Sequence, residues 1–253
     1  MQDAAFTDTH GWWPLGLHGS RLCYQEMRLL LTNDDGFGAR GLSLLAEVCS
    51  NHGAVTIVAP DEEQSGVGHR VNTRVALRCT ERDPSCFAVA GTPADCVRVG
   101  LKGLGLSPDW VISGLNHGGN LGVDIHLSGT VAGAREGAIL GCPAIAISQV
   151  INKDYPFRRE AVVALTARVI AELTARPLDA GQFYNVNLPF APESDEPELV
   201  FCLPDPSPHD VRYTRDGDDF SYAGVFLNRQ QLPGRDVSVV FSGKVAVSIL
   251  TIV

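Results

Sequence analysis

Short apolar segments alternate with longer amphipathic ones along most of this chain, and this alternation limits the fold more than any other feature. Strands that alternate with helices form a mostly parallel sheet with helices on both faces. We therefore predict an α/β fold with a Rossmann-like, doubly wound sheet. Strands are expected at residues 29–32, 54–59, 110–113, 144–148 and 183–188, and helices at 41–49, 130–140 and 157–175.

Two parts of the chain depart from the alternation. Residues 1–26 mix Gly, His and Trp without a period, so we interpret them as an extension, with Met27 as the natural start. Residues 27–189 form the predicted core. Residues 190–236 are rich in Pro, Asp and Arg and are expected to form an irregular arm or β-hairpin, and residues 237–253 the closing strand of the core.

Charge and cysteine usage exclude several classes of protein. The formal net charge of −9 opposes binding to a nucleic-acid backbone. No apolar run reaches the ~18 residues of a membrane helix, and the N-terminus lacks a secretory pattern. We therefore expect a cytoplasmic protein without nucleic-acid or membrane partners. The seven cysteines include no CxxC pair, which argues against a disulfide scaffold or a structural zinc site.

Two adjacent carboxylates, Asp34 and Asp35, follow the first predicted strand within the sequence Thr-Asn-Asp-Asp-Gly. Neighbouring ionised carboxylates repel each other, and a hard divalent cation with oxygen ligands relieves that repulsion. The same residues could also form an ordinary Asx-rich turn with solvated acids. Both interpretations stay open on this segment alone.

The segment that follows matches a different kind of site. Gly36, Gly38 and Gly41 form a G-x-G-x-x-G pattern between a strand and a helix, and Asp61 lies about 20 residues further on, as in dinucleotide-binding folds. An NAD(P)-dependent oxidoreductase is therefore an alternative. The acids directly before the glycines oppose it, because they would lie near the pyrophosphate.

Two further polar clusters follow predicted strands. Ser65 lies in an acidic loop after the second strand and could offer a hydroxyl oxygen. The third cluster, residues 113–130, contains five glycines together with Asn116 and Asn120, whose amides can act as ligands or donors. Its last residues, Ser128 to Thr130, precede a predicted helix, and helix N-termini bind phosphate. The hydroxyls there could instead only cap the helix.

Three histidines are candidates for acid–base roles. His117 and His126 lie within the third cluster, although an isolated loop histidine is more often structural. His209 lies in the arm and reaches a site only if the arm folds back. The sequence does not identify a general acid.

The three clusters, in this order, resemble the SurE (survival protein E) family of 5'/3'-nucleotidases. The resemblance covers most of residues 27–189. The matching segments are residues 29–36, 58–61 with 65–66, 91–96, 113–141 and 185–189.

The resemblance implies a metal-dependent phosphomonoesterase that hydrolyses nucleoside 5'- and 3'-monophosphates, and also short polyphosphate. It implies one divalent cation per subunit, Mn²⁺ or Mg²⁺, and a homodimer or homotetramer to which the arm contributes. Asp34 is the residue we expect to orient or deprotonate the attacking water. The implied metal ligands are Asp34, Asp35, Ser65 and Asn116, and the implied phosphate contacts are Asn120, Ser128, Gly129 and Thr130.

The chain departs from the family pattern in its extra leader, its short arm and the lack of a C-terminal helix after the closing strand. These departures leave a non-catalytic sensor of nucleotide or metal as a further alternative, since such a protein would keep the core and alter the arm.

Overall fold

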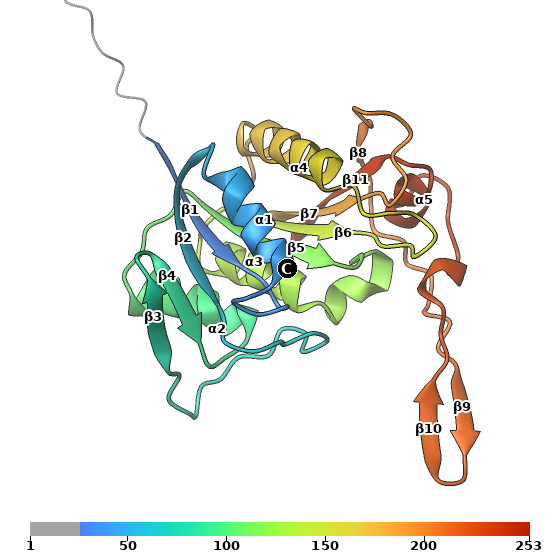
Figure 1. The fold of residues 1–253 in the computed structure, drawn as a ribbon, viewed down its shortest axis with the longest axis horizontal. Coiled ribbons are helices and arrows are strands. Elements are labelled where there is room, and N and C mark those ends of the chain that lie inside the picture. The colour runs from blue at the N-terminus through green and yellow to red at the C-terminus, as the bar shows by residue number, and fades with distance from the viewer. Residues whose placement is uncertain (1–25) are drawn as a thin grey trace, which may run out of the picture.

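In the computed structural model residues 26–253 are described, so the predicted extension lies, apart from exposed Glu26, outside the described residues. The centre is a nine-stranded sheet in the order β3-β4-β2-β1-β5-β6-β7-β11-β8 (Figure 1). Its strands are β1 (Met27–Thr32), β2 (Gly53–Pro60), β3 (Cys79–Asp83), β4 (Cys86–Val89), β5 (Trp110–His117), β6 (Ala144–Gln149), β7 (Gln182–Leu188), β8 (Leu199–Phe201) and β11 (Val245–Thr251).

The sheet is parallel through its middle, which confirms the predicted doubly wound fold. β1 pairs in parallel with β2 on one side and β5 on the other, and β5, β6 and β7 continue in the same direction. Within this nine-stranded sheet of residues 26–253, the antiparallel pairs are β3 with β4 and β7 with β11. Because the chain runs outward from β1 in one direction and from β5 in the other, the order of the strands reverses between β1 and β5.

Helices cover both faces of the sheet (Figure 1). The alternation of side chains along β1 explains the two layers. Leu29 and Leu31 pack with the apolar sides of α1 and α4, whereas Leu30 packs with α2 and α3 on the opposite face. A strand buried on both faces has a continuous apolar stretch, as observed at residues 29–31 of β1, 110–112 of β5 and 144–147 of β6. The helices are α1 (Arg40–Cys49), α2 (Pro93–Arg98), α3 (Gly129–Ile139), α4 (Arg159–Thr174) and α5 (Asp236–Phe241), with a π-helical turn at Val99–Gly103 and 3₁₀ turns at Gly122–His126 and Phe226–Asn228.

The structure differs from the expected arm in one respect and refines the closing segment. β8, expected within the arm, joins the main sheet in parallel beside β11. Within residues 237–253 the closing strand is β11, which begins at Val245, and the residues before it form α5, whose Val237 and Val240 are buried against Phe190 and Cys202. Consecutive valines favour a strand, but here burial in a third apolar cluster determines the helix.

The arm itself is a β-hairpin, as expected. β9 (Tyr213–Asp216) and β10 (Asp219–Tyr222) pair with each other in antiparallel fashion and project away from the body (Figure 1). None of the helices formed by residues 26–253 has the length and apolar character needed to cross a bilayer.

Candidate active site

The predicted carboxylates lie where the order of the strands reverses. β1 and β5 are adjacent, with Thr32 opposite Ser113. Asp34 and Asp35 follow β1 directly, and Asn116 lies near the end of β5. In open α/β sheets this crevice beyond the carboxyl ends of the strands is where ligands bind. The register therefore brings three of the four implied metal ligands to one place.

Asp34 is buried against the start of α3. The hydroxyl of Thr130 donates a hydrogen bond to Oδ1 of Asp34. Gly129 lies so close that an added Cβ would be 2.7 Å from the Cβ of Asp34. Only glycine fits at that position, so the carboxylate and the beginning of α3 form one packed unit.

Both carboxylates are destabilised in their ionised form. Burial raises the pKa of Asp34, and the charge of Asp35 adds to that rise, while the Thr130 hydroxyl opposes it. Burial also raises the pKa of Asp35, which the backbone N–H of His117 opposes. Two acids with raised pKa values at the mouth of a crevice have the electrostatics of a cation site.

The two neutral side-chain oxygens of the implied metal ligands, those of Asn116 and Ser65, have different surroundings. The Asn116 amide nitrogen donates to the carbonyl of Gly118 at 2.8 Å, which orients its carbonyl oxygen as the free ligand atom. Ser65 is exposed, and its hydroxyl donates to Glu63 at 2.8 Å. Its loop nevertheless adjoins the carboxylates, since the Gln64 N–H donates to the Asp34 carbonyl at 2.7 Å.

The residues implied in phosphate binding form two groups. Ser128 is the N-cap of α3, where its hydroxyl accepts from the Val131 N–H at 3.0 Å, and Gly129 and Thr130 make the first turn. Capping therefore uses the Ser128 hydroxyl. The remaining N–H groups of that turn are directed beyond the helix end, where an anion would bind.

Asn120 is the second group and lies at the centre of a buried amide network. Its side chain donates to the Ser148 hydroxyl at 2.7 Å, its backbone N–H to Asn187 at 2.8 Å, and its carbonyl accepts from Asn185 and Asn187. The motif at residues 185–189 thus holds Asn120 in place.

The segment between Asn120 and Ser128 is attached to the arm through Asp124. Asp124 accepts hydrogen bonds from His209 at 2.6 Å and from Arg229 at 2.6 and 3.1 Å. The base of the arm therefore does fold back, as required for His209 to approach the site. His117 and His126 are both exposed.

The glycine pattern does not form a dinucleotide loop. Gly36 has a φ of +99° and packs on Glu62 and Glu63, which directs Asp34 and Asp35 toward β5. An added Cβ on Gly41 would overlap the Leu115 carbonyl at 1.9 Å, so this glycine permits close contact of α1 with β5. The glycines thus shape the carboxylate turn, and the NAD(P) alternative is not favoured.

Sequence reasoning missed several residues around the site. The contact of the Thr130 hydroxyl with Asp34 joins residues 96 positions apart, and no local pattern signals it. Asp95 lies within the matching segment 91–96, where the resemblance assigns it no role. It caps α2 and binds Asn72 at 2.8 and 2.6 Å, which fixes the loop after Ser65. The T-x-x-D spacing from Thr92 was a usable capping signal.

The donor set fits a hard divalent cation. Residues 26–253 contain no cluster of three or more His, Cys, Asp or Glu side chains arranged to hold a metal. The candidate ligands are all oxygen atoms: two carboxylates with a raised pKa, one oriented amide carbonyl and one hydroxyl. Mg²⁺ and Mn²⁺ accept donors of this type, and water molecules complete their coordination sphere. They do not suit zinc, which prefers nitrogen and sulfur ligands.

Comparison with known proteins agrees with this geometry. The profile of the family described as "Survival protein SurE" matches residues 29–217. A protein from Nostoc sp. is 44% identical over 227 residues, covering 89% of this chain and all of that protein. The "5'-nucleotidase SurE" of Geotalea uraniireducens is 38% identical over 228 residues, covering 88% of this chain and 92% of that protein.

A solved structure shares the fold over most of this chain. The crystal structure of the SurE protein from Aquifex aeolicus superimposes with a TM-score of 0.78 at 32% identity, covering 88% of this chain and 93% of that chain. The doubly wound sheet, the carboxylate pair at the strand reversal and these matches lead to one conclusion: the chain belongs to the SurE family.

Proposed function

We propose that this protein is a metal-dependent 5'-nucleotidase that hydrolyses nucleoside monophosphates to nucleoside and phosphate. The hydrogen bond between Thr130 and Asp34 carries the proposal, because it joins a cation site to a phosphate-binding helix start. Hydrolysis of a phosphomonoester needs both parts within one site.

In this proposal the residues of the site have separate roles. Asp34, Asp35, Asn116 and Ser65 hold the cation, Ser65 by turning its hydroxyl from Glu63 toward the carboxylates. A bound divalent cation would polarise a phosphoryl oxygen and make a nearby water more acidic. The N–H groups of Gly129 and Thr130 bind the phosphoryl oxygens, and Asn120 is held beside them by its amide network.

Asp34 is the group we propose to orient and deprotonate the attacking water. Its hydrogen bond to Thr130 places the carboxylate beside the start of α3, next to where the phosphoryl group would be held. The Thr130 hydroxyl occupies Oδ1, so Oδ2 is the atom left to accept the proton. Mg²⁺ or Mn²⁺, one per subunit, is the cation that the oxygen donors favour.

The test is phosphate release from a panel of nucleoside 5'- and 3'-monophosphates and short polyphosphate, with Mn²⁺ or Mg²⁺ and with chelator. We expect hydrolysis of monophosphates that EDTA abolishes and excess metal restores. Asp34→Asn should lose at least about a hundredfold in kcat. Full activity of that variant, or hydrolysis unaffected by chelator, would contradict the proposal. Ligand binding without hydrolysis would indicate a sensor.

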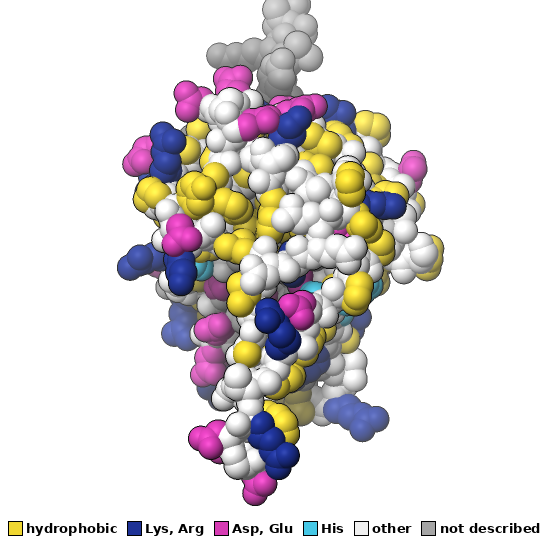
Figure 2. All heavy atoms as spheres, turned by 90° about the vertical axis from the view of Figure 1, so that its right-hand side faces the viewer, with side chains coloured by type: hydrophobic (Ala, Val, Ile, Leu, Met, Phe, Trp, Pro, Cys, Tyr) yellow, Lys and Arg dark blue, Asp and Glu magenta, His cyan; other side chains and the backbone are white. Residues whose placement is uncertain are grey.

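We further propose that the hairpin is the oligomerisation element. Tyr213, Phe220 and Tyr222 are each about 60% exposed on it (59%, 63% and 62%). Figure 2 shows the hairpin extending below the body, with hydrophobic side chains among charged ones. Exposed aromatics on a projecting element are typical of an interface. Light scattering should show a dimer or tetramer that a 213–222 deletion converts to monomer.

A further inference from the structure

A groove of about 860 Å³ opens directly from the carboxylate site. It begins at Asp35 and Asn116, runs along α1 as far as Glu47, and is bounded on the other side by Phe157 and Arg159. It lies on the face of the sheet covered by α1 and α4. The phosphate-binding start of α3 lies on the opposite face, so the carboxylates stand between the two.

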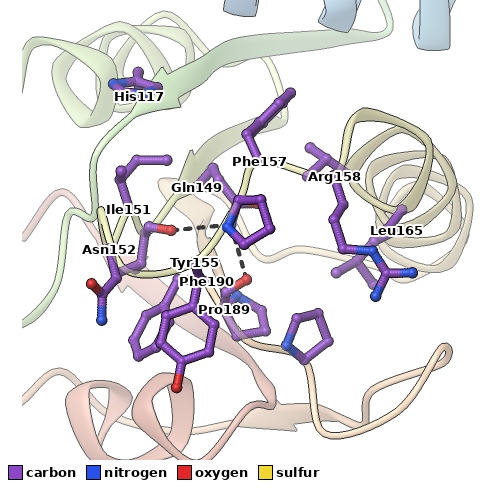
Figure 3. A pocket seen from close by; sticks show the side chains of 15 residues that line it. His117, Gln149, Ile151, Asn152, Tyr155, Phe157, Arg158, Leu165, Pro189 and Phe190 are labelled. Atoms are coloured by element: carbon purple, nitrogen blue, oxygen red, sulfur yellow. Dashed lines mark hydrogen bonds between the residues drawn. The ribbon is translucent and has the colours of Figure 1, made fainter.

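Gln149, at the floor of the groove, has an unsatisfied acceptor. The side chain is only 6% exposed. Its amide nitrogen donates to the carbonyls of Val150 at 3.1 Å and Pro189 at 2.9 Å (Figure 3). These bonds fix the orientation of the amide, and Oε1 is left buried without a hydrogen-bond partner among the described residues. Buried acceptors rarely stay unpaired, so this atom calls for an N–H or O–H donor.

The walls of the groove are suited to a flat, largely uncharged group. The Phe157 ring is 55% exposed, although aromatic rings are normally buried. Leu44 and Leu115 add apolar surface. Among the charged side chains of the groove, Arg159 and Glu47 form an ion pair, and Arg40 lies at the start of α1. The start of α1 carries no capping side chain, so its first N–H groups remain as donors at the mouth.

A second, smaller cavity of about 80 Å³ adjoins the groove behind His117 and Gln149. Tyr155 lines this cavity and packs on Phe190 with ring centroids 5.1 Å apart, outside the groove (Figure 3). Of the two aromatic residues in the loop after β6, Phe157 therefore lines both cavities, whereas Tyr155 lines only the smaller one.

We propose that the groove binds the nucleoside part of the substrate, with the base against Phe157 and an N–H donor of its edge directed to Gln149. The inference rests on the proposed function and adds the subsite for the leaving group. In this orientation the phosphate lies at the start of α3, the ester bond lies near Asp34 and Asp35, and the nucleoside lies along α1. The length of the groove and its junction with Asn116 support this orientation.

The experiment compares two substrates in the Phe157→Ala variant. AMP carries a nucleoside, whereas β-glycerophosphate is a phosphomonoester without one. We expect KM for AMP to rise about tenfold through loss of stacking, with little change in kcat. The kcat/KM for β-glycerophosphate should stay unchanged. Tyr155→Ala, two residues away on the same loop, is the matched control and should leave KM for AMP unchanged.

Adenosine binding tests the groove without catalysis. Calorimetry should show that wild type binds adenosine and that Phe157→Ala binds it about tenfold more weakly. Gln149→Met, which removes the acceptor at similar size, should also weaken it. Equal adenosine affinity in wild type and Phe157→Ala, no adenosine binding by wild type, or an equal loss with both substrates would overturn the groove assignment. Adenosine binding without phosphate release from any substrate would instead sustain the groove and contradict the nucleotidase.

Discussion

The Thr130 hydroxyl donates a hydrogen bond to the Asp34 carboxylate, which connects the first turn of α3 with the end of β1. This bond fixes the carboxylate relative to the helix start that we propose to bind the phosphate. A shift of either element would therefore move the cation and phosphate positions apart.

Thr130→Val tests this connection, because valine keeps the shape of the buried side chain and removes the donor. A hydrogen bond to a charged group contributes about 1.5–3 kcal/mol, so kcat/KM for AMP should fall about 10- to 100-fold. The affinity for Mn²⁺ should also fall. Thr166→Val is the matched control: this buried threonine bonds only the Val162 carbonyl of its own helix. Wild-type activity in Thr130→Val would rule out the role given to the hydroxyl.

Asp35→Asn should stabilise the metal-free protein at pH 7. Folding raises the pKa of Asp35, so the ionised carboxylate destabilises the folded state at pH 7. Replacing it with a neutral amide should therefore increase the free energy of unfolding. Because Asp35 is only partly buried, solvent screening limits the gain to less than about 1 kcal/mol, or at most roughly 2–4 °C in Tm. The gain should disappear in acid, where the wild-type carboxyl is protonated.

The same variant should lose the thermal stabilisation that Mn²⁺ gives wild type. Scanning calorimetry with EDTA and with Mn²⁺ measures both effects. A lower Tm of the variant in EDTA would show that Asp35 has a structural role.

Glu136→Gln should destabilise the protein, and the effect should depend on pH. Glu136 is fully buried and bonded to His69 at 2.7 Å and Arg98 at 2.6 Å. Burial alone would raise its pKa, but these hydrogen bonds outweigh burial and lower the pKa below its usual 4.5. The carboxylate therefore contributes stability above that value, which is lost as the pH falls through the folded-state pKa.

Urea unfolding at pH 7 should show a loss of about 2 kcal/mol for Glu136→Gln, and a smaller loss near pH 3.5. Glu198→Gln, at an exposed pair with Lys244, is the control and should change stability by less than about 0.5 kcal/mol. A loss at pH 3.5 as large as that at pH 7 would contradict the assigned ionisation.

The thiols should differ in reactivity. Burial raises the pKa of Cys49 to about 12 and of Cys142 to about 11, so both stay protonated at pH 8. Cys79 and Cys86 are only half-buried and should react first with Ellman's reagent. Cys23, outside the described residues, is replaced by Ser in this assay. A fast phase that persists in Cys79→Ser/Cys86→Ser would show that another thiol is exposed.

The sequence predicted the elements whose apolar pattern is strong. The strand at β1 and the helix at α1 were expected within two residues of their ends, because each buries a continuous apolar face. β3 was missed, since its sequence Cys-Thr-Glu-Arg-Asp is mostly charged and lies at an exposed sheet edge. An edge strand needs no apolar face when its neighbour supplies the hydrogen bonds.

For the site, the residue types were predictable and their mutual contacts were not. Adjacent aspartates after a strand are compatible with a cation site or with a solvated turn, and the polar clusters after the other strands favour the cation site. The unpaired oxygen of Gln149 depends on the carbonyls of Val150 and Pro189, and the latter lies 40 positions away. Only the assembled sheet brings these groups together.

His209 and Arg229 bond to Asp124, and these contacts divide the arm into a stem that is attached to the core and an outer hairpin that is not. The stem, which carries His209 and Arg229, is bonded to the segment between Asn120 and Ser128, so a change of length there would disturb the proposed phosphate-binding residues. The hairpin beyond it, from Tyr213 to Tyr222, pairs only with itself. Over evolutionary time the outer hairpin is therefore free to lengthen, shorten or change its partner, while the stem stays fixed with the chemistry.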